Sequence, residues 1–172
     1  MIQQNVSILA QLQTFLTQIS PQDYSRPLPL LQAQPIGRQV RHCLEFYICF
    51  LESISKPNAL LSYDKRKRDL RLETILEEAQ AQVLFLQKQL QKQQIPLVEL
   101  ILESDAPQGK MRLVSSTERE LLYLLEHTVH HLAILRLSAQ CYFPYIEFAG
   151  DFGVAYATQK NEAESNASKS NC

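Results

Sequence analysis

Apolar residues recur three or four positions apart in four stretches of the chain, which is the period of an amphipathic helix. These stretches cover approximately residues 3–19, 35–55, 69–93 and 117–140. Glycine and proline are nearly absent from their interiors, as long helices require. Ser20-Pro21 ends the first stretch and Lys56-Pro57 ends the second, because proline cannot continue a helix. The pattern predicts four long helices that bury their apolar stripes against one another.

The pattern changes between the third and fourth stretches. Apolar and polar residues alternate over residues 98–102 and again over 111–113, as they do in β-strands, and a turn with Pro107 and Gly109 lies between. The predicted fold class is therefore all-α, a four-helix bundle with a short β-hairpin between helices 3 and 4. The basic run "YDKRKRD", residues 63–69, is expected to be a solvated turn before the third helix.

An aromatic segment, "YIEFAGDFGVAYATQKN", follows Pro144 and is too short for a second domain. Its aromatic side chains fit two interpretations: they cap the open end of the bundle and shape a pocket, or they clamp the end of the chain onto it. The clamp is preferred. We expect residues 1–160 to form one domain that includes this packed segment. The small polar residues of 161–172 are expected to be disordered.

Composition excludes several classes of protein. The 172 residues carry a formal net charge of -1, with 17 basic and 18 acidic residues, so no strongly basic surface for nucleic acid or membrane is expected. No apolar stretch approaches the roughly 18 residues of a membrane span, and no signal peptide is recognisable. The four cysteines form no CxxC pair, which favours reduced thiols. We expect a cytoplasmic protein.

Three of the four histidines lie in the apolar stretch "LLEHTVHHLAIL", residues 124–135. At about 100° per residue, His127 and His131 are about 40° and one helical turn apart, so their rings can converge. His130 diverges toward the polar side of the helix. Burying an unpaired imidazole nitrogen costs about 1–3 kcal/mol. The pair is therefore either hydrogen-bonded in the core or bound to a transition metal.

The remaining histidine, His42, lies in the second predicted helix, at the margin of its apolar stripe. Three histidines from two helices would leave coordination positions open, as in catalytic metal sites. We therefore predict a metal site formed by His42, His127 and His131. Neutral imidazoles suit zinc, nickel, copper or iron. Hydrogen-bonded core histidines stay the alternative.

Other polar residues near these histidines have ordinary explanations. Glu45 lies one turn from Arg41 and either orients a ligand ring or forms an exposed ion pair, which is preferred. Glu126 and His130 are four residues apart, and a surface hydrogen bond is preferred to a proton shuttle. Cys49 lies on the same side of its helix as His42, but we expect a small apolar residue rather than a ligand.

Four motifs, "RHCLEFY", "YDKRKRD", "EHTVHHLAIL" and "DFGVA", occur in this order over roughly residues 30–156. Together they resemble the DinB-like superfamily of small metal-binding four-helix bundles. Its members hold a divalent metal, often zinc or nickel, with one histidine from the second helix and an HxxxH pair from the last. The resemblance implies that His42, His127 and His131 are the ligands. Relatives that share DFGVA tend to continue with Pro-Ser-Thr, where this chain has Tyr156-Ala157-Thr158.

Some members of this superfamily transfer low-molecular-weight thiols or isomerise thiol-linked substrates. The resemblance therefore implies a metal-dependent enzyme of thiol transferase or hydrolase type, acting on a small molecule such as a thiol, with catalytic residues beyond the ligands unassigned. The alternative is a non-catalytic metal- or ligand-binding protein, for which a homodimer is one expectation. No nucleic acid or membrane partner is expected, because the basic and acidic residues are balanced and no basic patch is evident.

Overall fold

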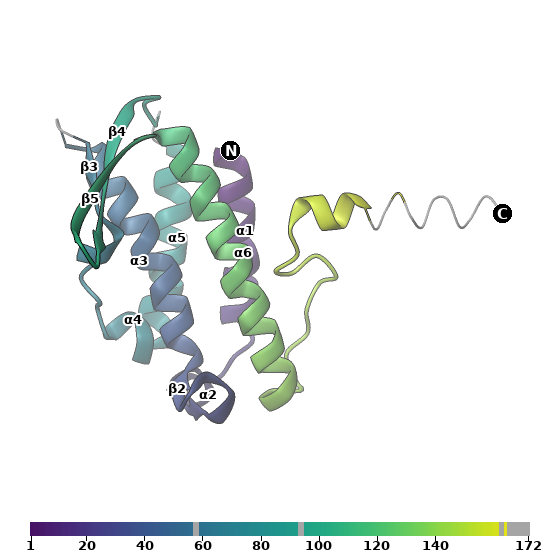
Figure 1. Cartoon of the computed structure of the whole chain (residues 1–172). Coiled ribbons are helices and arrows are strands. Elements are labelled where there is room, and N and C mark those ends of the chain that lie inside the picture. The colour runs from purple at the N-terminus through teal and green to yellow at the C-terminus, as the bar shows by residue number, and fades with distance from the viewer. Residues whose placement is uncertain (57–58, 93–94, 162–163, 165–172) are drawn as a thin grey trace.

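Four long helices lie side by side in the computed structural model, which describes residues 1–56, 59–92, 95–161 and 164 (Figure 1). They are α1 (Ile2–Leu16), α3 (Ile36–Ile54), α5 (Leu76–Lys92) and α6 (Thr117–Tyr142). The four predicted helices are therefore present, but the third is divided. A short helix, α4 (Arg71–Thr74), precedes α5, and Ile75 between them has an extended backbone with φ -115° and ψ 106°. None of the helices described combines the length and apolarity needed to cross a membrane.

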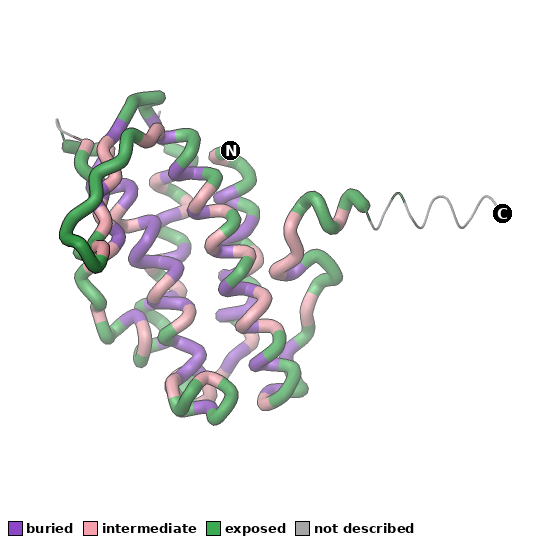
Figure 2. The backbone as a smooth tube through the Cα atoms, viewed as in Figure 1, coloured by how far each residue is buried: buried purple, intermediate pink, exposed green. Residues whose placement is uncertain are grey.

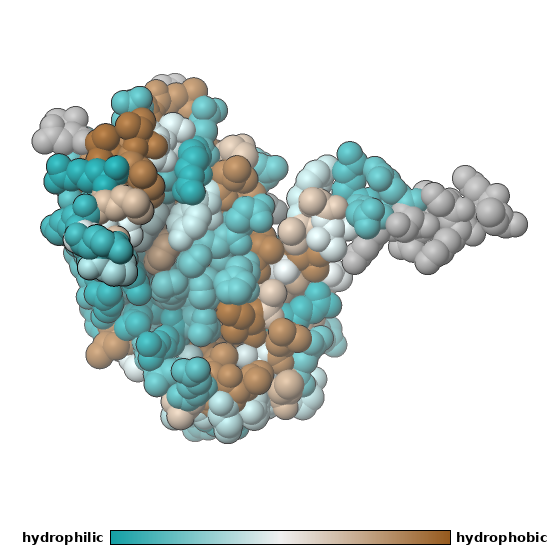
Figure 3. Space-filling view, viewed as in Figure 1, coloured by the Kyte–Doolittle hydropathy of each residue, from teal (hydrophilic) through white to brown (hydrophobic). Residues whose placement is uncertain are grey.

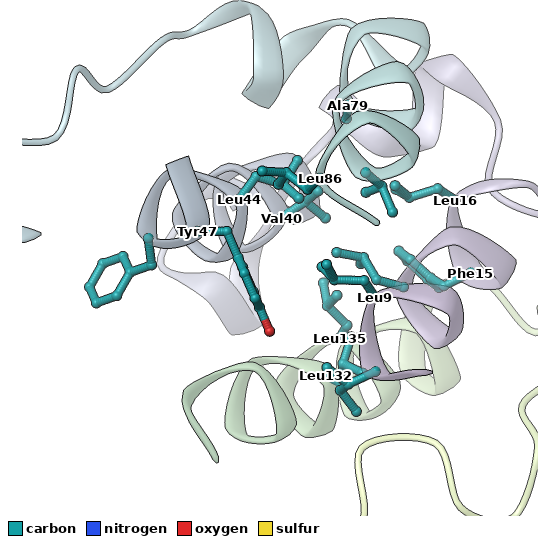
Figure 4. Close-up of a cluster of buried hydrophobic side chains, with 14 of the residues drawn as sticks. Leu9, Phe15, Leu16, Val40, Leu44, Tyr47, Ala79, Leu86, Leu132 and Leu135 are labelled. Carbon is teal, nitrogen blue, oxygen red and sulfur yellow. The ribbon is translucent and has the colours of Figure 1, made fainter. Parts of the chain in front are cut away.

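The core lies where the apolar stripes of the four long helices meet. Figure 2 shows buried residues along α1, α3 and α6, and Figure 4 shows side chains from the four helices converging on one volume. The labelled members are Leu9, Phe15, Leu16, Val40, Leu44, Tyr47, Ala79, Leu86, Leu132 and Leu135, all at most 1% exposed. Burying a leucine or phenylalanine side chain stabilises the fold by about 1.5–3 kcal/mol.

The structure also contains two β-sheets. The predicted hairpin is confirmed as β4 (Glu99–Ala106) and β5 (Gly109–Ser116), paired antiparallel. A short strand, β3 (Leu60–Leu61), pairs parallel to β4 and makes a three-stranded sheet in the order β3-β4-β5. Two further strands, β1 (Pro27–Leu28) and β2 (Gln34–Pro35), pair antiparallel.

The predicted all-α class is therefore wrong, because the chain combines helices with β-sheet. The hairpin is not an isolated insertion, because β3 pairs with β4 in the same sheet, with Leu60 opposite Ile101, 41 residues later in the chain. Three further short helices are α2 (Pro21–Ser25), η1 (Pro29–Leu31) and η2 (Tyr63–Lys65), and residues 156–161 are helical as well. Strand β5 lies at the edge of the three-stranded sheet, and its residues Met111, Leu113 and Val114 are exposed. Figure 3 shows hydrophobic surface at the end of the molecule where this sheet lies.

The aromatic segment after Pro144 clamps the end of the chain, as preferred from the sequence. Phe148 and Phe152 lie 6.1 and 6.3 Å from the ring of Phe15 on α1. The Arg136 side chain on α6 donates hydrogen bonds to the carbonyl oxygens of Gly150 and Phe152. The segment packs on α1 and α6 (Figure 1). The predicted disordered tail, 161–172, lies almost entirely outside the described residues; residues 161 and 164 are helical.

Gly153 fixes this segment against α6, and a substitution there tests the contact. Its φ is +66°, and an added Cβ would lie 2.7 Å from the backbone nitrogen of Ala133. Both strain and overlap oppose a side chain. We expect Gly153→Ala to lower the free energy of unfolding by about 1–3 kcal/mol, measured by urea denaturation. Gly150→Ala is the control, because its Cβ would meet nothing within 4 Å; equal effects of the two would contradict the packing.

Candidate metal centre

The three histidines predicted as ligands come together between α3 and α6. His42 lies on α3, while His127 and His131 lie one turn apart on α6. One ring nitrogen from each can be chosen so that all three lie within 4.8 Å of one another. The ring centroids are 5.0 Å apart for His42 and His127, 4.7 Å for His42 and His131, and 4.6 Å for His127 and His131. Two nitrogens bonded to one zinc ion at about 2.0–2.1 Å lie at most about 4.2 Å apart, so a small rotation of the rings would bring all three nitrogens onto one ion.

His130 and Cys49 do not belong to this cluster. His130 is exposed, as the angular analysis predicts, although its ring centroid lies 5.2 Å from that of His131. No hydrogen bond joins His130 to Glu126 in the described part of the chain, so the preferred surface bond is absent there. Cys49 is half-buried and lines a separate groove.

The environment keeps all three imidazoles neutral. Burial, followed by the neighbouring His127 and arginines, lowers the pKa of His42 to about 4. Burial with nearby His130 and Arg66 lowers the pKa of His127 to about 4. Burial and the other histidines lower the pKa of His131 to about 3. At neutral pH each ring therefore has a nitrogen lone pair available, which a metal ligand must have.

A glutamine on α3 orients one of the rings. The Nδ1 atom of His131 lies 2.8 Å from Oε1 of Gln39. Because a carboxamide oxygen only accepts, Nδ1 carries the proton and Nε2 keeps its lone pair. Metal-binding histidines commonly donate their second nitrogen in this way. Sequence reasoning missed Gln39, although its position one turn before His42 and Cys43 on the same helix was a usable signal.

The second ring has a buried nitrogen with no protein partner. Nε2 of His127 is inaccessible to solvent and makes no hydrogen bond. A core histidine held by hydrogen bonds would not leave this atom unsatisfied, because doing so costs about 1–3 kcal/mol. A cation bound by His42, His127 and His131 would satisfy it. The donor set therefore fits a divalent transition metal better than the alternative of hydrogen-bonded core histidines.

The hydrogen bond from His131 to Gln39 gives a testable expectation. In Gln39→Ala the ring loses its orienting partner, and we expect the affinity for zinc to fall about tenfold, as for other outer partners of metal ligands. The measurement is competition with a chelating indicator. Gln3→Ala, at an exposed position of α1, is the control. Unchanged affinity in Gln39→Ala would show that the hydrogen bond does not support the site.

An aromatic wall formed by Phe46, Tyr63 and Tyr123 covers one side of the centre. Phe46 stacks on His127 with centroids 4.3 Å apart and planes at 17°, and on Tyr63 with centroids 4.5 Å apart and planes at 7°. Tyr123 lies 5.5 Å from the His127 ring. Sequence reasoning missed this wall, because its rings come from three separate elements. It holds the His127 ring and limits water on that side.

The β-sheet positions Tyr63 in this wall. Asp64 accepts hydrogen bonds from Ser104 Oγ and from the Asp105 backbone, while Lys65 Nζ lies 2.6 Å from Glu103 Oε1. The Tyr63 hydroxyl donates to the fully buried Glu120 at 2.8 Å. The prediction that residues 63–69 form a simple solvated turn is therefore wrong. This run connects the β-sheet to the histidine centre.

Glu45 forms the predicted ion pair, but the pair is buried instead of exposed. Glu45 is 3% exposed, and its Oε2 lies 3.9 Å from Arg41 Nε and 3.4 Å from Arg66 Nε. Its Oε1 accepts a 2.6 Å hydrogen bond from the Asp69 backbone. Glu45 thus fastens the 66–69 segment to α3. The hypothesis that it orients a ligand ring gains no support from these contacts.

A groove of about 660 Å³ runs between α3, α5 and the 65–71 segment. Glu45, Cys49, Arg66 and Phe85 are among its lining residues, and none of the three clustered histidines is. The groove shares Glu45 and Arg66 with the surroundings of the centre, yet both side chains are engaged in the ion pair already described. The histidine cluster therefore lies outside this groove.

The chain matches no protein-family model, no curated protein and no solved structure. The resemblance of its four motifs to the DinB-like superfamily stays a prediction.

Proposed function

We propose that this chain binds one divalent transition metal ion, zinc or nickel, through His42, His127 and His131. The observation that carries the proposal is the convergence of three neutral imidazoles, with ligand atoms within 4.8 Å of one another, around a buried His127 nitrogen that has no protein partner. Gln39 fixes the tautomer of His131, and the aromatic wall holds His127 in place. These contacts preorganise a site for an ion.

We further propose that the protein is a metal-dependent enzyme of transferase or hydrolase type, acting on a small polar molecule such as a thiol. A divalent ion held by three imidazoles supplies Lewis acidity and lowers the pKa of a thiol or water that it binds. The motif resemblance supports the thiol class, and the free cysteines Cys43, Cys49 and Cys141 support a reducing compartment such as the cytoplasm. The chain's own residues orient the ligands and exclude water on the side of the aromatic wall.

One observation favours a second candidate, a non-catalytic metal-binding protein. Two buried carboxylates lie close to the centre, and both already have protein partners. Glu45 contacts Arg66 and Asp69, and Glu120 contacts Tyr63, Ser115 and Arg119. Neither is free to act as a general base. If catalysis needs such a base, the substrate or a bound water has to provide it. A storage or sensing role would need none.

The test uses protein purified without a histidine tag, stripped with a chelator and reloaded with zinc or nickel. Thiol transfer and ester or amide hydrolysis are then screened in the stripped and reloaded forms. The proposal predicts turnover only after reloading. Turnover that does not depend on metal would contradict it. Stoichiometric metal that raises the unfolding temperature without any turnover would favour the non-catalytic candidate.

A further inference from the structure

A polar hollow of about 470 Å³ adjoins the histidine centre. It is bounded by η1, by the turn before β2, by the first two turns of α3 and by Ile134 of α6. Gln39 belongs both to this hollow and to the centre, because it lines the hollow while its Oε1 contacts His131 Nδ1 at 2.8 Å. The volume is within the range of about 300–1,000 Å³ that is typical of small-molecule sites.

The chemistry of the lining suits an anion. Carboxamides from Gln32, Gln34 and Gln39 and the guanidinium of Arg38 line the hollow, and no carboxylate residue does. Arg38 is exposed, and within the described residues it forms no ion pair and no hydrogen bond through its side chain. The other arginines near the centre differ, since Arg41 lies 3.1 Å from Glu73 and Arg66 lies 3.4 Å from Glu45. Among the described residues, Arg38 is therefore an unneutralised cation close to the histidines.

The position of Arg38 directs its charge toward the metal site. It precedes His42 by four residues on α3, so the two side chains share a face of the helix and lie one turn apart. None of the three histidines lines the hollow itself, so a molecule held by Arg38 would have to extend past Gln39 to reach them.

The backbone of the lining is held in an unusual conformation. Gln32 and Ala33 have φ of 55° and 59°, in the left-handed region. Backbone hydrogen bonds from Gln32 to Pro29 and from Ala33 to Leu28, together with the β1–β2 pairing, hold the turn. Such conformations cost about 1–3 kcal/mol each at non-glycine residues and require a supporting structure. The turn thus presents Gln32 and Gln34 to the hollow in a fixed arrangement.

We propose that this hollow is a substrate subsite that recognises a carboxylate group, with Arg38 as the residue that determines specificity. The inference rests on the proposed function, because the other end of the substrate would bind at the metal. A guanidinium presents two parallel N–H donors that match the two oxygens of a carboxylate. The carboxamides of Gln32 and Gln34 can add further donors. The substrate class is therefore a small molecule with a metal-binding donor atom at one end and a carboxylate at the other.

The test uses the Co²⁺-loaded protein, whose visible absorption reports ligand binding at the metal. Two probes of the same shape are titrated, 3-mercaptopropionate and its neutral amide, 3-mercaptopropionamide. In the wild-type protein we expect the carboxylate probe to bind at least about tenfold more tightly than the amide, as for one charge-assisted bidentate contact. In Arg38→Gln the two affinities should become equal. Arg112→Gln, at an exposed arginine on β5, should keep the preference.

Cobalt stoichiometry and circular dichroism are measured for each variant, so that loss of the metal or of the fold is recognised. Equal affinity for both probes in a wild-type protein that holds cobalt would overturn the subsite while leaving the metal centre in place. A preference that survives in Arg38→Gln would also overturn the role of Arg38. A wild-type protein that binds no cobalt would contradict the metal centre, and the subsite with it.

Discussion

We expect His127→Phe to lose tight zinc binding while its metal-free form stays folded. Loss of an outer partner of a metal ligand costs 10- to 100-fold in affinity, and loss of a ligand itself costs more. With two imidazoles in place of three, the dissociation constant for zinc should rise by at least about a hundredfold. Phenylalanine keeps the ring shape that stacks on Phe46 at 4.3 Å.

The same substitution should not destabilise the metal-free protein. Nε2 of His127 is buried without a hydrogen bond, and phenylalanine removes this unsatisfied atom. We therefore expect the free energy of unfolding of the metal-free variant to equal or exceed that of the metal-free wild type. A structural histidine would give the opposite result, because its removal would break a hydrogen bond.

The matched control is His130→Phe, the same change at the exposed neighbour on α6. Zinc affinity, measured by competition with a chelating indicator, should stay within about threefold of the wild type in this variant. Metal-free stability is measured by urea denaturation in chelator. Equal losses of zinc affinity in the two variants would show that His127 is not a metal ligand.

We expect the largest effect on stability from Gly37→Ala at the start of α3. A Cβ at Gly37 would overlap the carbonyl oxygen of Glu73 and lie 2.9 Å from Cε1 of Tyr24. The overlap is with backbone, so α4 must move away from α3. Such a movement would disturb the hydrogen bond from the Tyr24 hydroxyl to Leu72 and the ion pair of Arg41 with Glu73.

Overpacking of this kind usually costs 1–3 kcal/mol, and more where a backbone element has to shift. We expect Gly37→Ala to lower the free energy of unfolding by about 3 kcal/mol or more, measured by denaturation with urea. Gly150→Ala, where the Cβ would meet nothing within 4 Å, should change stability by less than about 0.5 kcal/mol. A stable Gly37→Ala variant would show that α4 does not lie against α3 as described.

The long helices and the histidine cluster could be predicted because their signals are local and periodic. The spacing of apolar residues marks the stripes of α1, α3, α5 and α6 within a few residues. On α6, the angle of about 100° per residue separates His131, which is 8% exposed, from the exposed His130. His42 could be added because it lies at the margin of an apolar stripe, where a helix faces a neighbour and solvent together.

The remaining features depend on contacts between distant segments. Leu60 and Leu61 become a strand only because β4 lies beside them, and two residues are too few for an alternating pattern. The predicted all-α class was wrong because this pairing and the β1–β2 pair extend the β-structure beyond the one hairpin that the sequence predicts. Tyr63 joins the aromatic wall through Asp64 and Lys65, whose partners lie about 40 residues later on β4. No local pattern reports such a connection.

Gln39 shows a different limit of sequence reasoning. Its position one turn from the site is evident, but a glutamine on a helix is usually a solvated residue. Only the distance of 2.8 Å to His131 identifies its role. The same holds for Arg38, whose significance depends on the lack of a counter-charge in the described surroundings.

The most direct test of the metal centre is a crystal structure of tag-free protein grown with zinc, with diffraction data on both sides of the zinc absorption edge. We expect one anomalous peak per chain, about 2.0–2.1 Å from one nitrogen each of His42, His127 and His131. An anomalous map with no peak between α3 and α6, with the three imidazoles hydrogen-bonded only to protein or water, would contradict it.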